Sequence, residues 1–300
     1  MGSISRLPGI MTVAAIAGTG LMAAPAAQAQ VMARPAMVSV PCGTAALASA
    51  ISAANSRDAT TLRLTSGCTY SITTPATGTD GLPIITGNIA IEATGNTVIS
   101  RSTAAPTAFR ILDVAAHGAL SLSGVTVRNG STTGLGGAIL NAGRLQITNV
   151  VLSGNAAGNG GALANASGAS ANVLDAVIEE NTTTGVGGGG IINSGTLRLA
   201  GSRVYSNSAP INGGGLNTQA SGISQITQSS FSRNVSGSLG GAISNLGSTS
   251  LTQTVVRQNS GYRGGGIATA NSNVTLHASV FSGNTPDNCN PLNTIPGCVN

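Results

Sequence analysis

The residues best suited to chemistry stand in pairs, each directly before one of six regularly spaced asparagines. The pairs include Glu179 and Glu180, Tyr205, Arg233 and Arg257. If successive pairs stack, these side chains would lie about 5 Å apart on an outward ridge, close enough to bridge one another or to grip a polar partner. We therefore predict a ligand-binding ridge at these five residues, although a solvated face with incidental charge pairs is the simpler interpretation.

Signs of catalysis are few. Hydrolysis by paired carboxylates needs two carboxyl groups at a defined separation across the substrate. Only Asp175, Glu179 and Glu180 are close in sequence, and adjacent residues of a strand point to opposite faces. His117 and His277 are far apart and show no nucleophile partner, and no CxxC spacing indicates a metal site. We predict no catalytic residue, no metal and no cofactor.

The period of the asparagines indicates how such residues are positioned. The steps between them are 25 to 27 residues, and a paired-glycine motif runs in phase with them. The asparagines are Asn155, Asn181, Asn207, Asn234, Asn259 and Asn284. The glycine pairs begin at Gly136, Gly160, Gly188, Gly213, Gly240 and Gly264. A repeat of this length is typical of a solenoid, in which each repeat is one turn.

Each repeat has the pattern of short strands. The residue three before each asparagine is always apolar, as is the residue eight before it, and the segments around them alternate at period two. Nothing in the repeat indicates a helix. A coil of this size cannot bury its own apolar side, so it must stack in parallel on the next coil. We predict an all-β fold, a single-stranded parallel β-helix of about nine coils over residues 61–285.

The asparagines themselves are predicted to be structural. Stacked asparagines at a turn can hydrogen-bond along the axis and so satisfy buried polar groups. The open ends of a solenoid need covers. We expect residues 30–60 to form an N-terminal cap, with a helix between Thr44, as N-cap, and Asn55 that buries Leu47 and Ile51. Residues 286–300 should form a C-terminal cap.

The repeat motifs resemble those of a known family. The GG-Ala-Ile segments, with Phe231-Ser232-Arg233-Asn234 and Phe281-Ser282-Gly283-Asn284, are similar to the GGAI and FxxN repeats of the polymorphic outer membrane proteins. The resemblance spans about residues 136–284 and implies a right-handed parallel β-helix with an adhesive role. The chain is also similar to secreted bacterial right-handed β-helix proteins of pectate-lyase-like architecture. Fold and site are separate matters, so this second similarity supplies only an alternative function, that of a polysaccharide lyase or hydrolase.

The beginning of the chain predicts export. Arg6 gives a short basic start, residues 10–24 are apolar but too short to span a bilayer, and Ala27-Gln28-Ala29 matches a cleavage site. We predict a signal peptide over residues 1–29, a secreted or cell-surface location, and no membrane span after cleavage. In an exported chain, four cysteines favour disulfides. Of the three possible connectivities, the local one, Cys42 to Cys68 and Cys289 to Cys298, closes the shortest loops.

Composition limits the class of partner. Charged residues make up 7% of the chain, and cleavage would leave twelve arginines against eight acidic residues. This excess is too thin for nucleic acid, whose binding relies on several phosphate contacts and often on aromatic side chains. The expected function is adhesin-like binding, without catalysis, to an extracellular polysaccharide, the cell envelope or a protein. Each glycine pair begins only five to seven residues after the preceding asparagine, so the loops between them are too short to wall a deep cleft.

Overall fold

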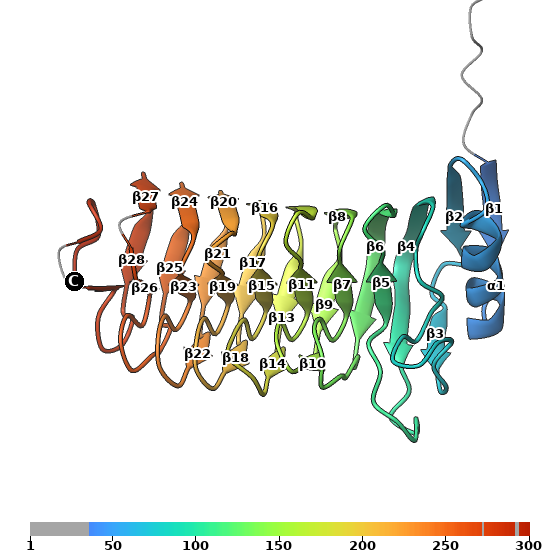
Figure 1. Ribbon diagram of the computed structural model, residues 1–300, viewed down its shortest axis with the longest axis horizontal. Coiled ribbons are helices and arrows are strands. Elements are labelled where there is room, and N and C mark those ends of the chain that lie inside the picture. Colours follow the sequence, from blue (N-terminus) through green and yellow to red (C-terminus); the bar gives the residue numbers. More distant parts are fainter. Residues whose placement is uncertain (1–35, 272, 292–293) are drawn as a thin grey trace, which may run out of the picture. The chain divides into compact units, whose positions relative to one another are not determined.

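The computed structural model describes residues 36–271, 273–291 and 294–300. The predicted signal peptide, residues 1–29, lies outside them. From residue 36 onward the chain forms a parallel β-solenoid of about ten turns, with its coils stacked along one axis (Figure 1). The prediction of an all-β fold of stacked parallel strands is confirmed. The solenoid begins upstream of the expected residue 61, because β1 (Ala36–Val40) already pairs in parallel with β2 (Thr60–Leu64).

Each coil contributes strands to two adjoining faces of one 17-stranded sheet. The first face contains β1, β2, the N-terminal parts of β4 (Asn88–Arg101) and β6 (Ala119–Arg128), β8 (Arg144–Thr148), β12 (Ser170–Leu174), β16 (Thr196–Ala200), β20 (Ile223–Thr227), β24 (Ser248–Thr252) and β27 (Val274–His277). The second face contains β3 (Thr69–Ile72), the C-terminal parts of β4 and β6, β9 (Val151–Ser153), β13 (Val177–Glu179), β17 (Arg203–Tyr205), β21 (Ser230–Ser232), β25 (Val255–Arg257) and β28 (Val280–Ser282).

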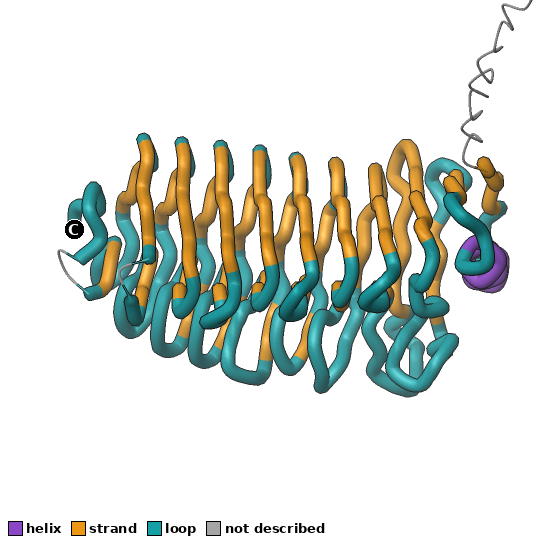
Figure 2. Tube along the Cα trace, turned by 45° about the horizontal axis from the view of Figure 1, so that its top comes forward, coloured by secondary structure: helices purple, strands orange, loops and turns teal. Residues whose placement is uncertain are grey.

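A third face closes each coil and carries the paired-glycine motif. It contains β5 (Leu112–Val114), β7 (Ile139–Asn141), β11 (Leu163–Asn165), β15 (Ile191–Asn193), β19 (Leu216–Thr218), β23 (Ile243–Asn245), β26 (Ile267–Thr269) and β29 (Cys289–Asn290). Turns join the second face to the third (Figure 2), and they hold a small sheet of β10 (Ala156–Ala157), β14 (Thr182–Thr183), β18 (Ser208–Ala209) and β22 (Val235–Ser236).

The apolar rows of the sequence lie inside the coils. Ile147, Leu199 and Phe231 are at most 1% exposed, and each stacks in register on the corresponding residue of the next coil. Between the first and second faces the chain turns at one residue with positive φ. Asp175, at 50°, belongs to this turn row. The two rows of inward side chains thus fix which residues of every coil face solvent.

The predicted asparagine row is buried and hydrogen-bonded along the axis. Asn207 shows the pattern: its Nδ2 donates to Asn234 Oδ1 at 2.9 Å and to the Ile178 carbonyl at 2.9 Å, while its Oδ1 accepts from Asn181 Nδ2 at 2.9 Å and from the Asn181 backbone N–H at 3.0 Å. The row begins where the Gly130 N–H donates to Asn155 Oδ1. We call this row the first ladder.

A second buried row, which the sequence analysis missed, ends the strands of the third face. Asn141 Nδ2 donates to Asn165 Oδ1 at 2.8 Å, and Asn165 Nδ2 donates to Asn193 Oδ1 at 2.8 Å. Further along, Thr218 and Asn245 take the same position and bond to hydroxyls of the first face. The signal was present in the sequence, since Asn or Thr stands five residues after the first glycine of every pair.

The N-terminal end is covered by helix α1 (Thr44–Ala54) (Figure 1). Leu47 and Ile51, which the helical pattern places toward the core, are buried, and Ala54 on the same face is buried as well. The predicted N-cap was wrong: the cap residue is Gly43, and Thr44 Oγ1 instead donates to the Ser71 carbonyl at 2.8 Å. Thr44 therefore ties the helix to β3 rather than to its own first turn.

Two disulfides join Cys42 to Cys68 and Cys289 to Cys298, which confirms the predicted local connectivity. The first lies beside helix α1, and the second closes the last described segment, where Ile295 is buried against the core. Disulfides persist in oxidising compartments, so both bonds fit an extracellular protein. Over the described ranges, no helix has the length and apolar character needed to cross a membrane.

Candidate functional site

The predicted ridge divides into two neighbouring rows along the edge of the second face. Glu179, Tyr205 and Arg257 belong to one row, because Glu179 pairs with Tyr205, Tyr205 with Ser232, and Ser232 with Arg257. Glu180 and Arg233 belong to the next row, in which the backbone has a φ of 56° and 54°. The structure thus brings Glu179 beside Tyr205 on adjacent coils. Tyr205 and Arg257 are two coils apart, with Ser232 between them. Glu180 and Arg233 are also two coils apart.

The carboxylates and arginines of the ridge do not neutralise one another. In the described part of the chain, ion pairs occur only at Arg63–Glu92 and Arg110–Asp80, far from the ridge in sequence. Glu180, Arg233 and Arg257 are exposed, while Glu179 and Tyr205 are half-buried. The ridge therefore keeps an acidic end and a basic end.

Glu179 has a pKa above its ordinary value. Burial is the main cause, and the neighbouring charge of Glu180 adds to it, whereas Arg203 acts in the opposite direction. Arg203 was not among the predicted residues. It stands two residues before Tyr205 on β17, so the alternation of the strand places both side chains on the outer face.

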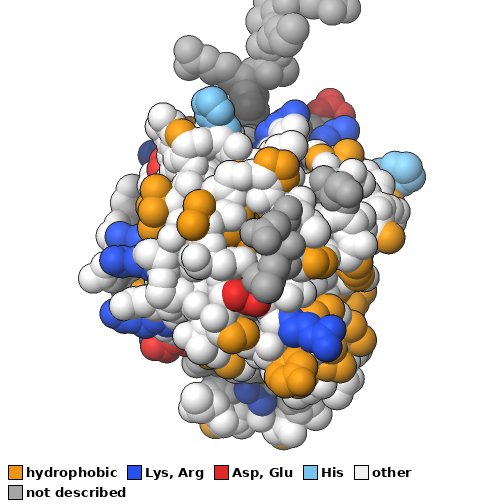
Figure 3. All heavy atoms as spheres, turned by 90° about the vertical axis from the view of Figure 1, so that its left-hand side faces the viewer, with side chains coloured by type: hydrophobic (Ala, Val, Ile, Leu, Met, Phe, Trp, Pro, Cys, Tyr) orange, Lys and Arg blue, Asp and Glu red, His pale blue; other side chains and the backbone are white. Residues whose placement is uncertain are grey.

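Net positive charge is concentrated in the later coils, because acidic residues are absent from them. Between residues 181 and 286 the chain contains five arginines and no aspartate or glutamate. All five are exposed, namely Arg198, Arg203, Arg233, Arg257 and Arg263. In the end view of Figure 3, basic side chains gather on one flank, and another lies beside exposed hydrophobic side chains near the lower edge. Tyr205, Arg203, Arg233 and Arg257 occupy three successive coils of the second face, and we call them the basic strip.

The early coils hold a different group of charges, which the sequence analysis did not expect to be close together. Arg110 Nε lies 2.6 Å from Asp80 Oδ1, both side chains are 9% exposed, and Arg110 Nη1 donates to the Leu135 carbonyl at 3.0 Å. Burial raises the pKa of the nearby Asp113, an effect that Arg110 opposes and Asp80 reinforces. Because Arg110 is buried and bonds to both Asp80 and the Leu135 carbonyl, this cluster ties three coils together and offers a substrate little access.

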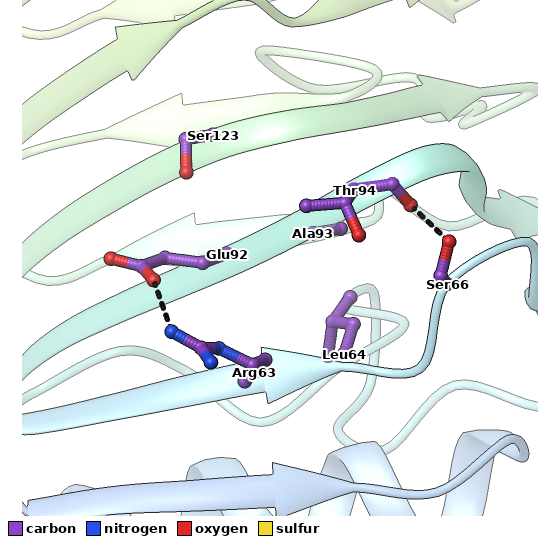
Figure 4. A pocket seen from close by; sticks show the side chains of 7 residues that line it. All are labelled: Arg63, Leu64, Ser66, Glu92, Ala93, Thr94 and Ser123. Atoms are coloured by element: carbon purple, nitrogen blue, oxygen red, sulfur yellow. Dashed lines mark hydrogen bonds and ion pairs between the residues drawn. The ribbon is translucent and has the colours of Figure 1, made fainter.

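A cavity of about 530 Å³ opens near the start of the first face. Its lining includes Arg63 and Glu92, whose side chains point toward each other, and Ser123 on the next coil (Figure 4). Sequence reasoning missed this cavity, since it examined loop lengths only in the regular repeats. Within the described ranges, His, Cys, Asp and Glu form no group of three that could hold a metal ion.

Comparison with protein-family models, with curated proteins and with solved structures finds no match to this chain. The resemblance to polymorphic outer membrane protein repeats thus rests on the GGAI and FxxN motifs alone. Any functional statement must come from the surfaces described above.

Proposed function

We propose that this is a secreted, non-catalytic binding protein with a right-handed β-helix, which holds an acidic extracellular polysaccharide along the basic strip. The observation that carries the proposal is the run from residue 181 to residue 286 with five exposed arginines and no acidic residue. A site of one charge sign attracts polymers of the opposite sign, and its arginines can each donate several hydrogen bonds to carboxylates.

The spacing of the basic strip suits an extended polymer. Arg203, Arg233 and Arg257 come from three successive coils, which places their charges over about 10 Å along the solenoid axis. A linear acidic polysaccharide lying along the axis would present carboxylates to each arginine in turn. Tyr205, half-buried on the same strand as Arg203, offers a ring edge and a hydroxyl to the sugar.

The same geometry argues against nucleic acid and against catalysis as the main role. One tyrosine and three arginines provide few phosphate contacts and a single stacking surface. Two carboxyl groups, Asp80 and Asp113, lie near Arg110, and both Asp80 and Arg110 are buried, which leaves a substrate little access. The adhesin-like role implied by the repeat motifs agrees with binding through the side of the coils, as on a cell envelope.

Binding to immobilised polygalacturonate tests the proposal. Replacing Arg203, Arg233 and Arg257 together by glutamine should weaken binding at least about tenfold and flatten its dependence on salt. Glutamine is tolerated at the turn position of Arg233, since Gln258 has the same positive φ in the same row. The matched control replaces Arg57, Arg198 and Arg263, which removes equal charge from other surfaces.

Equal loss in both triple variants would show that net charge alone drives binding and would refute the strip as a site. Tighter binding to single-stranded DNA than to polygalacturonate would redirect the proposal to nucleic acid. New reducing or unsaturated ends in the polymer, lost in the first variant only, would favour the lyase or hydrolase alternative.

A further inference from the structure

The cavity near the start of the first face exists because two successive coils turn more widely than the next one. Between Glu92 and Thr97 the register of β4 against β6 shifts: four residues stand where β6 has only Gly124, between Ser123 and Val125. The preceding coil also has four residues at this corner, between Arg63 and Cys68, as the pairing of Thr69 with Val98 shows. The corner after Ser123 is shorter by three residues, so the surface of this coil is recessed relative to the two coils before it. We call this recess the step.

Hydrogen bonds hold the two wide corners in place, and these corners form one side of the step. Ser66 Oγ donates to the Thr94 carbonyl at 2.9 Å, the Gly67 N–H donates to Thr97 Oγ1 at 3.2 Å, and Thr97 Oγ1 in turn donates to the Thr94 carbonyl at 3.0 Å. These hydrogen bonds connect the two corners to each other. The cavity of about 530 Å³ is therefore part of the folded coils, and its volume lies within the range of small-molecule sites.

The polar groups that line the cavity retain hydrogen-bonding capacity. Arg63 Nη2 and Glu92 Oε2 are 4.0 Å apart, beyond hydrogen-bond distance, and their side chains are 58% and 45% exposed. Neither the Thr94 nor the Ser123 hydroxyl has a hydrogen-bond partner among the residues that the structure describes. The buried pair Arg110–Asp80, at 2.6 Å, shows the opposite arrangement, because its bonds are already made. Figure 4 shows Arg63, Glu92 and Ser123 converging from three neighbouring strands.

We propose that this cavity binds a neutral hexose unit of an oligosaccharide. Opposite charges 4.0 Å apart largely cancel for a charged ligand, so neither an acidic nor a basic group gains net attraction. A carboxylate can accept from two adjacent sugar hydroxyls, a guanidinium can donate to others, and the serine and threonine hydroxyls can do either. Ala93 supplies a small apolar contact for the ring.

The surface beside the cavity can take further sugar units. A smaller hollow of about 120 Å³ lies along β2 and β4, the strands that carry Arg63 and Glu92. Thr61, Asn88 and Ala90 line it. It continues at Asn88 into another of about 300 Å³ that reaches Gln146 and Asn172. Thr61, Asn88, Gln146 and Asn172 are uncharged hydrogen-bonding groups, which a neutral oligosaccharide can use, and Arg144 is the one charged residue that lines these two hollows. This site lies on other coils than the basic strip and does not depend on the proposed function.

Titration calorimetry of the full chain with cellohexaose, maltohexaose and mannohexaose tests the proposal. At least one of these neutral probes should bind saturably below about 10 mM. Glu92→Gln and Arg63→Gln should each weaken that binding at least about tenfold, because each removes a charged hydrogen-bond partner. Asp175→Asn, which removes an exposed carboxylate that does not line the cavity, is the matched control and should leave binding unchanged.

A second variant blocks the cavity without altering charge. Ser123→Leu fills the step with an apolar side chain and should abolish binding, while the thermal unfolding of Glu92→Gln and Arg63→Gln verifies that these exposed changes leave the fold intact. Failure of all three probes to bind would overturn the proposal. So would binding that survives both Glu92→Gln and Arg63→Gln, or binding confined to oligogalacturonate.

Discussion

The early coils, before residue 130, and the regular coils after it stack in the same way but have different interiors. Before residue 130 the largest buried side chains are apolar or aromatic, such as Tyr70, Phe109 and Ile85. After it, the coils also carry buried asparagines and hydroxyls whose hydrogen bonds run along the axis. Gly130 precedes the first ladder, and Asn288 ends it by accepting from Asn284 Nδ2 at 2.8 Å.

This difference in the interior explains why corner shape varies in the early coils and not in the regular ones. A ladder asparagine needs a matching neighbour above and below, so each regular coil must keep the period and the tight corner. The early coils, whose interior is filled mainly by apolar side chains, keep strand register but carry wide corners, long loops and the Asp80–Arg110 pair. Repetition makes the later coils a uniform scaffold for surface charge, while the wide corners of the early coils create the cavity of about 530 Å³.

The largest loss of stability that we predict for the regular coils follows from substitution in the paired glycines. A Cβ on Gly189 would stand 2.4 Å from the Gly214 carbonyl and 2.5 Å from the Ser208 carbonyl, and backbone in a regular coil cannot yield. Gly189→Ala should cost about 3 kcal/mol or more of unfolding free energy, measured by chemical denaturation.

Gly168→Ala is the control for this substitution. Gly168 has a φ of 78°, but nothing lies within 4 Å of its added Cβ, so only conformational strain of about 1 kcal/mol is expected. Equal costs for the two variants would mean that close packing of coils does not set the glycine pairs.

The next effect concerns the first ladder. Asn207→Ala removes the acceptor of the Asn181 N–H and two donors to neighbouring coils, so it should cost about 1–3 kcal/mol. Ser208→Ala, one residue further on and exposed, should cost much less. Thermal unfolding that ranks the two variants equally would contradict a stabilising role for the ladder.

The regular coils could be predicted from the sequence because their period alone aligns equivalent residues. Once the asparagine step was known, the inward rows at Ile147 or Phe231 and the outward position of Arg257 followed from strand alternation. The helix was predictable for a similar reason, since Leu47 and Ile51 mark one face. Local disulfide pairing also needed no knowledge of distant contacts.

The early coils could not be predicted in the same detail. Arg110 meets Asp80 across 30 residues without any repeated spacing to indicate it. The cavity at Glu92 arises from a difference in corner length between adjacent coils, which becomes visible only when the strand register is known. Arg203, in contrast, was predictable, because the strand that presents Tyr205 to solvent also presents the residue two positions earlier.

The smallest predicted effect tests the electrostatics of the early coils. Burial raises the pKa of Asp113 above its ordinary value of 3.8, so the folded protein holds this proton more tightly than the unfolded chain. The associated stability is fully present below pH 3.8 and is lost as pH rises through the raised pKa. Asp113→Asn, which mimics the protonated form, should therefore gain stability relative to the wild type as pH rises from acid to neutral. Denaturation curves across this range measure the gain, and Ser121→Ala, in which neither side chain titrates, should show a constant difference. A gain from Asp113→Asn that shrinks with rising pH would indicate that Arg110, rather than burial, dominates at this carboxyl.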